Sequence, residues 1–395
     1  MQMTVIPDWY HACMNLRIRL FLYLSVLSAF WILLAACGSV VSGSRESQLP
    51  ACNGNAPVFS QAPVDPGLLQ GIAPLGKLNP PSHTFPTQHT YWYAKGAFIN
   101  GEELLADVPD VVSPGEVWVT RAARVEFASR SYKTDYSIEY SPCDDLYGWF
   151  GHLSALDPAL LAALEPFEDC SSRSTADESI TECFSHQRVK LNPGDPIGKM
   201  GIFGNLDVGL LDHRVSHTFA NPERVPWLTS IVCPLDYYAE EPRALLEALL
   251  GSHDGLMKRS GEPICGTVAQ DTPGTAAGIW VLRDLPEGFV EGWGIALAAD
   301  SIDPSKSALS MGNVDSQVDA SVLHLTTDEA APFNNVTDGD VRCFDAVPAS
   351  MWVEPTPHRI VLSLIDDTLF LWVDRDAACG GWNGALPSSA IAFVR

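Results

Sequence analysis

The sequence predicts a mainly β protein with two folded domains. Short runs of β-branched and aromatic residues alternate with turns that contain Pro or Gly, from residue 72 to about residue 228 and again from 258 to 395. Helical patterns are confined to two short stretches. The 395 residues suffice for two domains of ordinary size, and an apolar content of 46% is typical of folded protein. We therefore expect a β-sheet domain with short helical insertions, followed by a small β-barrel or β-sandwich.

Local composition sets the expected domain boundaries. Residues 38 to about 68 are rich in Gly, Ser, Pro and Asn without periodicity, which predicts a flexible tether. Residues 240–250 have acidic residues and a Pro at the start and are followed by Gly251, which predicts a helix between the domains. The expected segments are a signal at 1–37, the tether at 38–70, the first β domain at 71–230, a helical connector at 231–257 and the second β domain at 258–395.

Individual elements are expected within these domains. Residues 157–167 predict a short helix or paired turns, inserted into the first domain. Asp366 and Asp367 separate two apolar runs, which predicts a hairpin in the second domain. Strands are expected at 90–93, 116–120, 136–140, 278–282, 292–297, 360–364 and 369–373.

The N-terminal segment is typical of an export signal. Basic residues precede an apolar run that ends in Leu-Ala-Ala-Cys, and the run is short for a membrane-spanning helix. This pattern resembles the signal of bacterial lipoproteins, with Cys37 as the lipidated residue and Met14 as a better start than Met1. The resemblance implies an exported protein anchored in the cell envelope by acyl chains, at the outer membrane in a diderm bacterium. The alternative is a single-span anchor with an incidental cysteine.

The other cysteines indicate disulfides in an oxidising compartment. Of the ten cysteines, setting aside Cys13 and Cys37 leaves eight, without any Cys-x-x-Cys pair. We expect Cys170–Cys183, which closes a polar loop, and Cys343–Cys379 in the last domain.

The charge balance limits the possible partners. There are 24 basic and 48 acidic side chains, which gives a net charge of −24. Nucleic acids and anionic lipid surfaces need clustered Lys and Arg, so neither is an expected partner of the folded domains.

Three short sequence motifs between residues 147 and 210 carry a family resemblance. They are YGWFGHLS at 147–154, LNPGDPIGKMG at 191–201 and GNLDVGL at 204–210. Their order resembles the core of the lysostaphin-like zinc endopeptidases, which cut peptidoglycan cross-links. In that family a Tyr-x-His-Leu-Ser strand precedes a Pro-Gly-x-x-Ile-Gly-x-x-Gly turn and a His-x-His strand. The resemblance covers about residues 72–228 and implies an antiparallel β-sheet peptidase domain that uses zinc.

Site residues follow from this resemblance by position. His152 matches the family's histidine that handles protons and does not bind metal, and Asp207 stands at the third metal ligand. Asn205 stands at the second catalytic histidine. Asn205 and Asp207 lie two apart in a strand and so point to the same face. Asp is a competent zinc ligand, whereas Asn205 cannot transfer a proton near neutral pH but can donate to an oxyanion.

The first ligand phrase departs from the family pattern. The family has His-x-x-x-Asp, but here His83 and His89 stand six residues apart, and the residue four after His83 is Thr87, which is not a usual ligand. Either a turn at Pro86 brings the two histidines together to bind zinc with Asp207, or the site has lost its metal-binding geometry. In the second case His83 and His89 are strand or turn residues that make ordinary hydrogen bonds.

Three functions remain open from the sequence. A zinc metallo-endopeptidase would use His152 for proton transfer or to hold the oxyanion. A pseudo-peptidase would use the same groove to bind cell-wall peptide, glycan or an envelope protein, and Asn205 favours it. A purely structural envelope module predicts that His83, His89, His152 and Asp207 do not converge. A shared fold does not fix function.

Overall fold

The protein is mainly β, as predicted, and the part that can be described forms one compact unit, Leu49–Arg395. The computed structural model describes residues 49–54, 57–97, 107–128, 134–174, 179–284, 291–314, 319–349 and 356–395. The predicted signal segment, with Met14 and Cys37, lies outside these residues. Within them, no helix is both long and apolar enough to cross a membrane.

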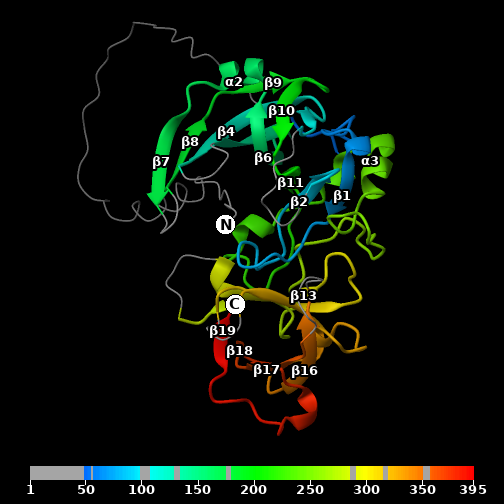
Figure 1. Ribbon diagram of the computed structural model, residues 1–395, viewed down its shortest axis with the longest axis vertical. Helices are drawn as coiled ribbons and strands as arrows, with labels where there is room; N and C mark the ends of the chain where they lie inside the picture. Colours follow the sequence, from blue (N-terminus) through cyan, green and yellow to red (C-terminus); the bar gives the residue numbers. More distant parts are fainter. Residues whose placement is uncertain are drawn as a thin grey trace, which may run out of the picture. The chain divides into compact units, whose positions relative to one another are not determined.

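The first domain is built on one large antiparallel sheet. Its main path runs β1-β2-β11-β6-β5-β4-β8-β7, β10 pairs with β3 and β6, and β9 pairs with β4 (Figure 1). The strands are β1 (Leu69–Ala73), β2 (Thr90–Ala94), β3 (Asp110–Val112), β4 (Val117–Phe127), β5 (Thr134–Cys143), β6 (Leu146–Leu156), β7 (Glu168–Ser174), β8 (Ser179–Ser185), β9 (Val189–Leu191), β10 (Pro196–Met200) and β11 (Asn205–Asp212).

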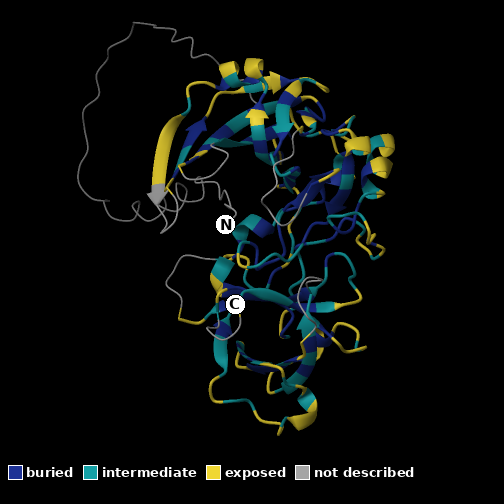
Figure 2. Cartoon of the chain, in the orientation of Figure 1, coloured by how far each residue is buried: buried dark blue, intermediate teal, exposed yellow. Residues whose placement is uncertain are grey.

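Alternation along β11 gives the sheet two different faces. Leu206, Val208 and Leu210 are fully buried in the main core, where Trp92 and Phe150 also pack. The residues between them point to the opposite face, because successive side chains of a strand alternate. Figure 2 shows the buried strands in the centre of this domain. The predicted common face of Asn205 and Asp207 is therefore the face away from the main core.

The two α-helices of the described residues lie where helices were expected. Helix α2 (Pro158–Leu164) begins after Asp157, whose carboxylate accepts hydrogen bonds from the N–H groups of Ala159 and Leu160. Helix α3 (Glu240–Glu247) falls in the expected connector. The 3₁₀ turns are η1 (Pro66–Leu68), η2 (Pro226–Leu228), η3 (Pro234–Tyr237), η4 (Glu291–Trp293), η5 (Pro332–Asn335) and η6 (Cys379–Gly381).

The tether predicted at 38–70 is too long at its C-terminal end. Phe59 is only 1% exposed, and its N–H donates to the carbonyl of Tyr237 over 3.1 Å. Val64 is also buried in the main core, and β1 already begins at Leu69. The segment has the composition of a linker but carries enough apolar residues to pack, so burial overrides the local signal.

The second domain is a closed barrel, one of the two shapes expected. Each strand pairs with the next, and β12 pairs with β19 to close the circle. Large apolar side chains such as Trp280, Phe344 and Phe393 fill its interior. The strands are β12 (Gly278–Leu282), β13 (Gly294–Ala299), β14 (Ser307–Met311), β15 (Ser321–Leu325), β16 (Val341–Pro348), β17 (His358–Ile365), β18 (Thr368–Arg375) and β19 (Ile391–Val394).

The predicted hairpin joins β17 to β18. Its two turn residues, Asp366 and Asp367, have φ angles of 48° and 59°. Two left-handed residues in succession are the mark of a type I′ turn, which matches the twist of the flanking strands.

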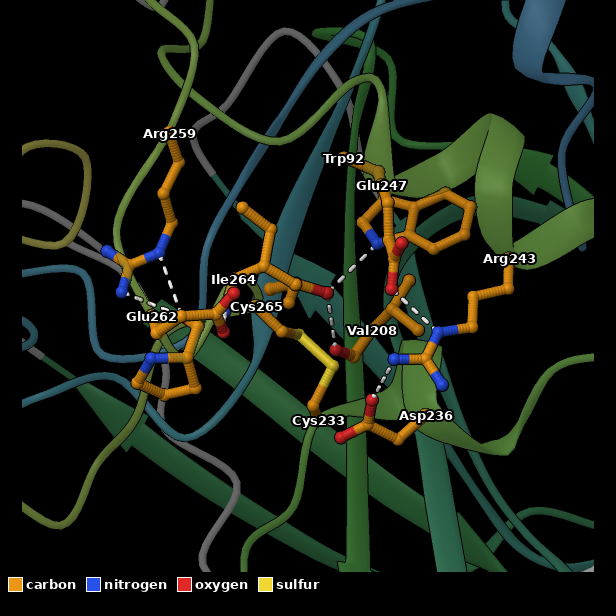
Figure 3. Close-up of a disulfide and its surroundings, with 12 residues drawn as sticks. Trp92, Val208, Cys233, Asp236, Arg243, Glu247, Arg259, Glu262, Ile264 and Cys265 are labelled. Carbon is orange, nitrogen blue, oxygen red and sulfur yellow. Dashed lines mark hydrogen bonds and ion pairs between the residues drawn. A yellow bond between two sulfur atoms is a disulfide. The ribbon is translucent and has the colours of Figure 1, made fainter. Parts of the chain in front are cut away.

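Four disulfides form among the described residues, and they fit an exported protein. The two predicted pairs, Cys170–Cys183 and Cys343–Cys379, are both present. The others are Cys52–Cys143 and Cys233–Cys265. Figure 3 shows Cys233–Cys265, which joins the chain before η3 to the segment that leads toward the barrel.

Apolar contacts join the barrel to the sheet domain. Ile279 and Val281 of β12 pack in one buried cluster with Leu75 and Phe85, which flank the segment that contains His83. The barrel wall therefore lies against the part of the sheet domain that carries the predicted site.

Candidate functional site

The four residues singled out from the sequence meet on the sheet face opposite the main core. His89 Nε2 lies 3.6 Å and His152 Nε2 lies 3.4 Å from the same oxygen of Asp207, Oδ2. The rings of His83 and His89 are edge to face, with centroids 5.3 Å apart. The two histidine rings therefore lie against each other, and binding of zinc by this pair with Asp207 stays a prediction.

A doubled-back loop before β2 positions these histidines. His83 and Asn79 exchange backbone hydrogen bonds of 2.7 and 2.9 Å, which closes a tight turn. The Thr87 N–H then donates to the carbonyl of Lys77 over 3.1 Å, and the Thr87 hydroxyl donates to the same carbonyl. The N–H and the hydroxyl of Thr87 are thus both bonded within the loop. The residue whose side chain lies beside His83 is His89.

An irregular backbone sets the direction of the His152 side chain. Its φ angle is 61°, in the left-handed region that non-glycine residues rarely adopt. The pairing of β5 with β6 shifts register around it, between Tyr136 and Ile138. Its Nδ1 is hydrogen-bonded to Asp135 Oδ2 over 2.8 Å. Strain of this kind is concentrated at functional sites, where surrounding contacts hold it in place.

Asp207 lies at the centre of the site, and the glycine beside it on β6 leaves room for its side chain. It pairs with Tyr91 of β2 and with Gly151 of β6. A Cβ atom on Gly151 would stand 3.3 Å from the Asp207 Cβ, a tight contact. Asn205 begins the same strand, and its backbone carbonyl accepts a hydrogen bond from Gly201. No hydrogen bond or ion pair joins the Asn205 side chain to the four central residues in the described part of the chain.

Burial controls the protonation of the central groups. His83 and His89 are each 4% exposed, and burial lowers the pKa of both to about 3, with the neighbouring histidine as the next cause in each case: His89 for His83, and His152 for His89. Burial raises the pKa of Asp207, partly offset by His152. Both histidines are therefore neutral at physiological pH, the form in which imidazole binds a metal.

One oxygen of Asp207 lacks a partner. Asp207 Oδ1 is buried without a hydrogen bond, and so is the Thr84 hydroxyl in the same loop as His83. Burying a polar atom without a partner costs about 1–3 kcal/mol. Such an atom in a cluster of histidines marks a place that a cation or a polar ligand would satisfy.

His83, His89 and Asp207 are of the residue types that bind zinc, but their donor atoms do not all converge on one point. Zinc bonds of about 2.0–2.2 Å in a tetrahedron place neighbouring ligand atoms roughly 3.3–3.6 Å apart. The separation of 3.6 Å between His89 Nε2 and Asp207 Oδ2 agrees with this and is too long for a hydrogen bond. His83, His89 and Asp207 do not, however, bring three donor atoms within 4.8 Å of one another; of the described residues only Cys52, Asp144 and Asp145 do so. Cys52 is bonded to Cys143, so that cluster is not a metal site.

Three ionisable residues of the site were missed from the sequence. Asp135 binds His152. Lys77 lies with its Nζ 5.0 Å from the centre of the Tyr91 ring and bonds to the Tyr93 hydroxyl over 3.2 Å. Glu291, in the barrel, has Oε2 3.8 Å from His83 Nδ1. None stands in a motif, and only the pairing of distant segments brings them here.

Comparison of the chain with protein-family models, with curated proteins and with solved structures found no match. A function for this chain is therefore inferred from its own residues.

Proposed function

We propose that this chain is an exported, lipid-anchored protein of the bacterial cell envelope whose large sheet carries a divergent zinc site acting on cell-wall peptide. The observation that carries the proposal is the meeting of His83, His89, His152 and Asp207. Two of the histidines face Asp207 Oδ2, while Asp207 Oδ1 is buried without a partner. These side chains come from three separate segments of the chain. If the histidines only made unrelated hydrogen bonds, there would be no reason for them to meet at one aspartate.

Each residue has a role in this proposal. His83, His89 and Asp207 hold zinc, which supplies a Lewis acid for a peptide carbonyl when it is bound. His152 stands on the more open side of the site, since its side chain is 25% exposed. Asp135 fixes the His152 ring and stabilises its protonated form, so His152 can accept and return a proton. The catalytic part expected of Asn205 stays a prediction.

The proposed location rests on the lipoprotein-like sequence around Cys37 and on the four disulfides. Disulfides persist in oxidising compartments such as the periplasm and the cell surface. A lipid on Cys37 would hold the folded unit near the membrane, within reach of peptidoglycan.

A second candidate function is binding of cell-wall peptide, or of an envelope protein, without hydrolysis. The observation that favours it is the low exposure of the site: both ligand histidines are 4% exposed, and the Asp207 side chain is 13% exposed. A peptidase must admit a carbonyl to the metal, whereas a binding module need not.

Zinc content of the full-length protein tests the proposal. The chain, purified in detergent without a histidine tag, is expected to hold one zinc, and a His89→Ala/Asp207→Ala variant is expected to hold none. The matched control is His324→Ala, because His324 is also paired with an aspartate, Asp300 at 3.0 Å, but lies in the barrel wall. If the unaltered chain stays free of metal even after incubation with excess zinc, the zinc proposal is wrong.

Digestion of purified peptidoglycan then separates the two functions. Release of peptide fragments by the zinc-loaded chain, lost in His152→Ala, supports the peptidase. Sedimentation with peptidoglycan without any fragment release supports the binding module.

A further inference from the structure

A groove separate from the candidate zinc site lies beside helix α3. It has a volume of about 570 Å³ and is formed by the chain from residue 60 through η1, by β3 and by the first two turns of α3. Pockets that bind ligands commonly have volumes of about 300–1,000 Å³. The described residues that line the groove include none of the residues of the zinc site. It is therefore a second place where this chain has room for a partner.

Two leucines expose apolar surface in this groove. Leu68 of η1 is 46% exposed, and Leu245 of α3 is 54% exposed. Figure 2 shows that much of α3 is open to solvent. A single exposed leucine is ordinary on a protein surface, but here two of them line one concave surface together with Ala62 and Val112. Such a surface gains stability when a ligand with an apolar side chain covers it.

The groove offers acceptors of hydrogen bonds rather than donors. Asp65, Asp110 and Glu241 line it, whereas no lysine, arginine or histidine is found among its described lining residues. Three prolines also line it, and proline has no backbone N–H. Asp65 and Glu241 are both exposed, and neither forms an ion pair with another described residue. A ligand that fits must therefore bring the donors and the positive charge.

The basic side chains nearby do not neutralise these carboxylates. Lys199 Nζ lies 2.8 Å from Asp110 and 3.9 Å from Asp107, and so is shared between two acidic groups. On α3, Arg243 is likewise paired with two carboxylates, one on η3 and one on α3 itself. The charge around the groove consequently stays negative.

We propose that this groove docks a peptide segment of a partner protein in which a lysine or an arginine stands beside an aliphatic residue. The aliphatic side chain covers Leu68 and Leu245, and the cationic group pairs with Asp65 or Glu241. Charge complementarity favours this partner over an anionic lipid surface, which the carboxylates would repel. The proposal does not depend on metal in the candidate zinc site.

A short labelled peptide tests the groove directly. The probe is acetyl-Leu-Lys-Leu-Arg-amide with a fluorophore, and fluorescence anisotropy follows its binding to the full-length protein in detergent. We expect the dissociation constant to rise by about three- to tenfold in Asp65→Asn/Glu241→Gln, because each exposed ion pair contributes modestly to affinity. Asparagine at position 65 still accepts a hydrogen bond from the Gly67 N–H, so the start of η1 is kept. Leu245→Ser should weaken binding by a similar factor, because an apolar contact is lost.

A matched variant and two altered probes serve as controls. Glu223→Gln/Asp328→Asn removes the same charge from two exposed carboxylates that do not line the groove, and it should leave the affinity unchanged. A probe with glutamate in place of both basic residues, and a probe with glycine in place of both leucines, should each bind more weakly.

Three results would overturn the proposal. The first is the absence of measurable binding of the probe to the unaltered chain. The second is equal affinity in the groove variant and the control variant, or equal binding of the probe without leucines, since attraction to the net charge of −24 would then explain the binding. The third is self-association of the chain that Leu245→Ser abolishes, which would assign the groove to a second copy.

Discussion

His83 and His89 are two bases kept neutral by the protein around them. In water each would take up a proton near pH 6.5, but in the folded chain burial lowers the pKa of both to about 3. The unfolded chain therefore binds more protons than the folded chain between these two values. It follows that the free energy of unfolding falls as the pH falls from about 6.5 toward 3.

We predict that replacing one of these histidines makes the zinc-free protein less sensitive to acid. Each histidine contributes a slope of up to about 1.4 kcal/mol per pH unit between the two pKa values. Urea unfolding at several pH values, with a chelator present, should give a shallower slope for His89→Asn than for the unaltered chain. His186→Asn is the control, since the His186 side chain is 61% exposed. Equal slopes for His89→Asn and the unaltered chain would contradict a neutral, buried His89.

At this scale the sequence predicted the central residues but not those that support them. His152 and Asp207 were found because short motifs surround them, and His83 and His89 because they lie upstream in the expected place. Asp135 was missed because its bond to His152 depends on the shifted register between β5 and β6. Glu291 was missed because it follows Phe85, to which it bonds, by 206 residues.

At the scale of elements, local chemistry predicted well wherever a turn or cap residue is specific. The cap of α2 at Asp157 and the hairpin at Asp366 and Asp367 are where the sequence placed them. The register shift between β5 and β6 that orients His152 cannot be recognised in the local sequence, because the packing of neighbouring strands decides where a bulge forms.

The hairpin turn offers a direct test of its backbone strain. We predict that Asp367→Gly raises the free energy of unfolding by about 1 kcal/mol, because φ is 59° there and glycine adopts this region without a steric penalty. Thr368→Gly, at the first residue of β18, is the control and should lower it by about 0.5–1 kcal/mol. Guanidinium unfolding measures both, and a loss of stability in Asp367→Gly would contradict the turn geometry.

For the whole molecule, the sequence predicted the two-domain order but misplaced both edges of the first domain. Residues before Leu69 pack into the sheet domain, as Phe59 does. Residues after 258 do so as well: Cys265 lies in the main core, and its carbonyl accepts a hydrogen bond from Leu75 over 2.9 Å. The barrel begins only at Gly278. These irregular segments have no periodicity, so only their tertiary contacts assign them.

Arg395 links the end of β19 to the chain around the start of β12. The Arg395 guanidinium stacks 4.0 Å from the centre of the Trp280 ring and donates to the carbonyls of Thr272 and Ala277. We predict that Arg395→Ala lowers the free energy of unfolding by about 3 kcal/mol, and that Arg395→Lys does not restore it, because lysine lacks the planar fork. The control is Arg375→Ala, whose partner Asp319 is 98% exposed and which should change stability by less than about 0.5 kcal/mol. Equal effects of Arg395→Ala and Arg375→Ala in urea unfolding would contradict this role.

The contact between Glu291 and the loop of His83 also sets an order of events during synthesis and export. The loop emerges about two hundred residues before its partner, and contacts this distant in sequence form late because loop closure must come first. The packing of the barrel against the loop of His83 is therefore expected to be one of the last steps of folding.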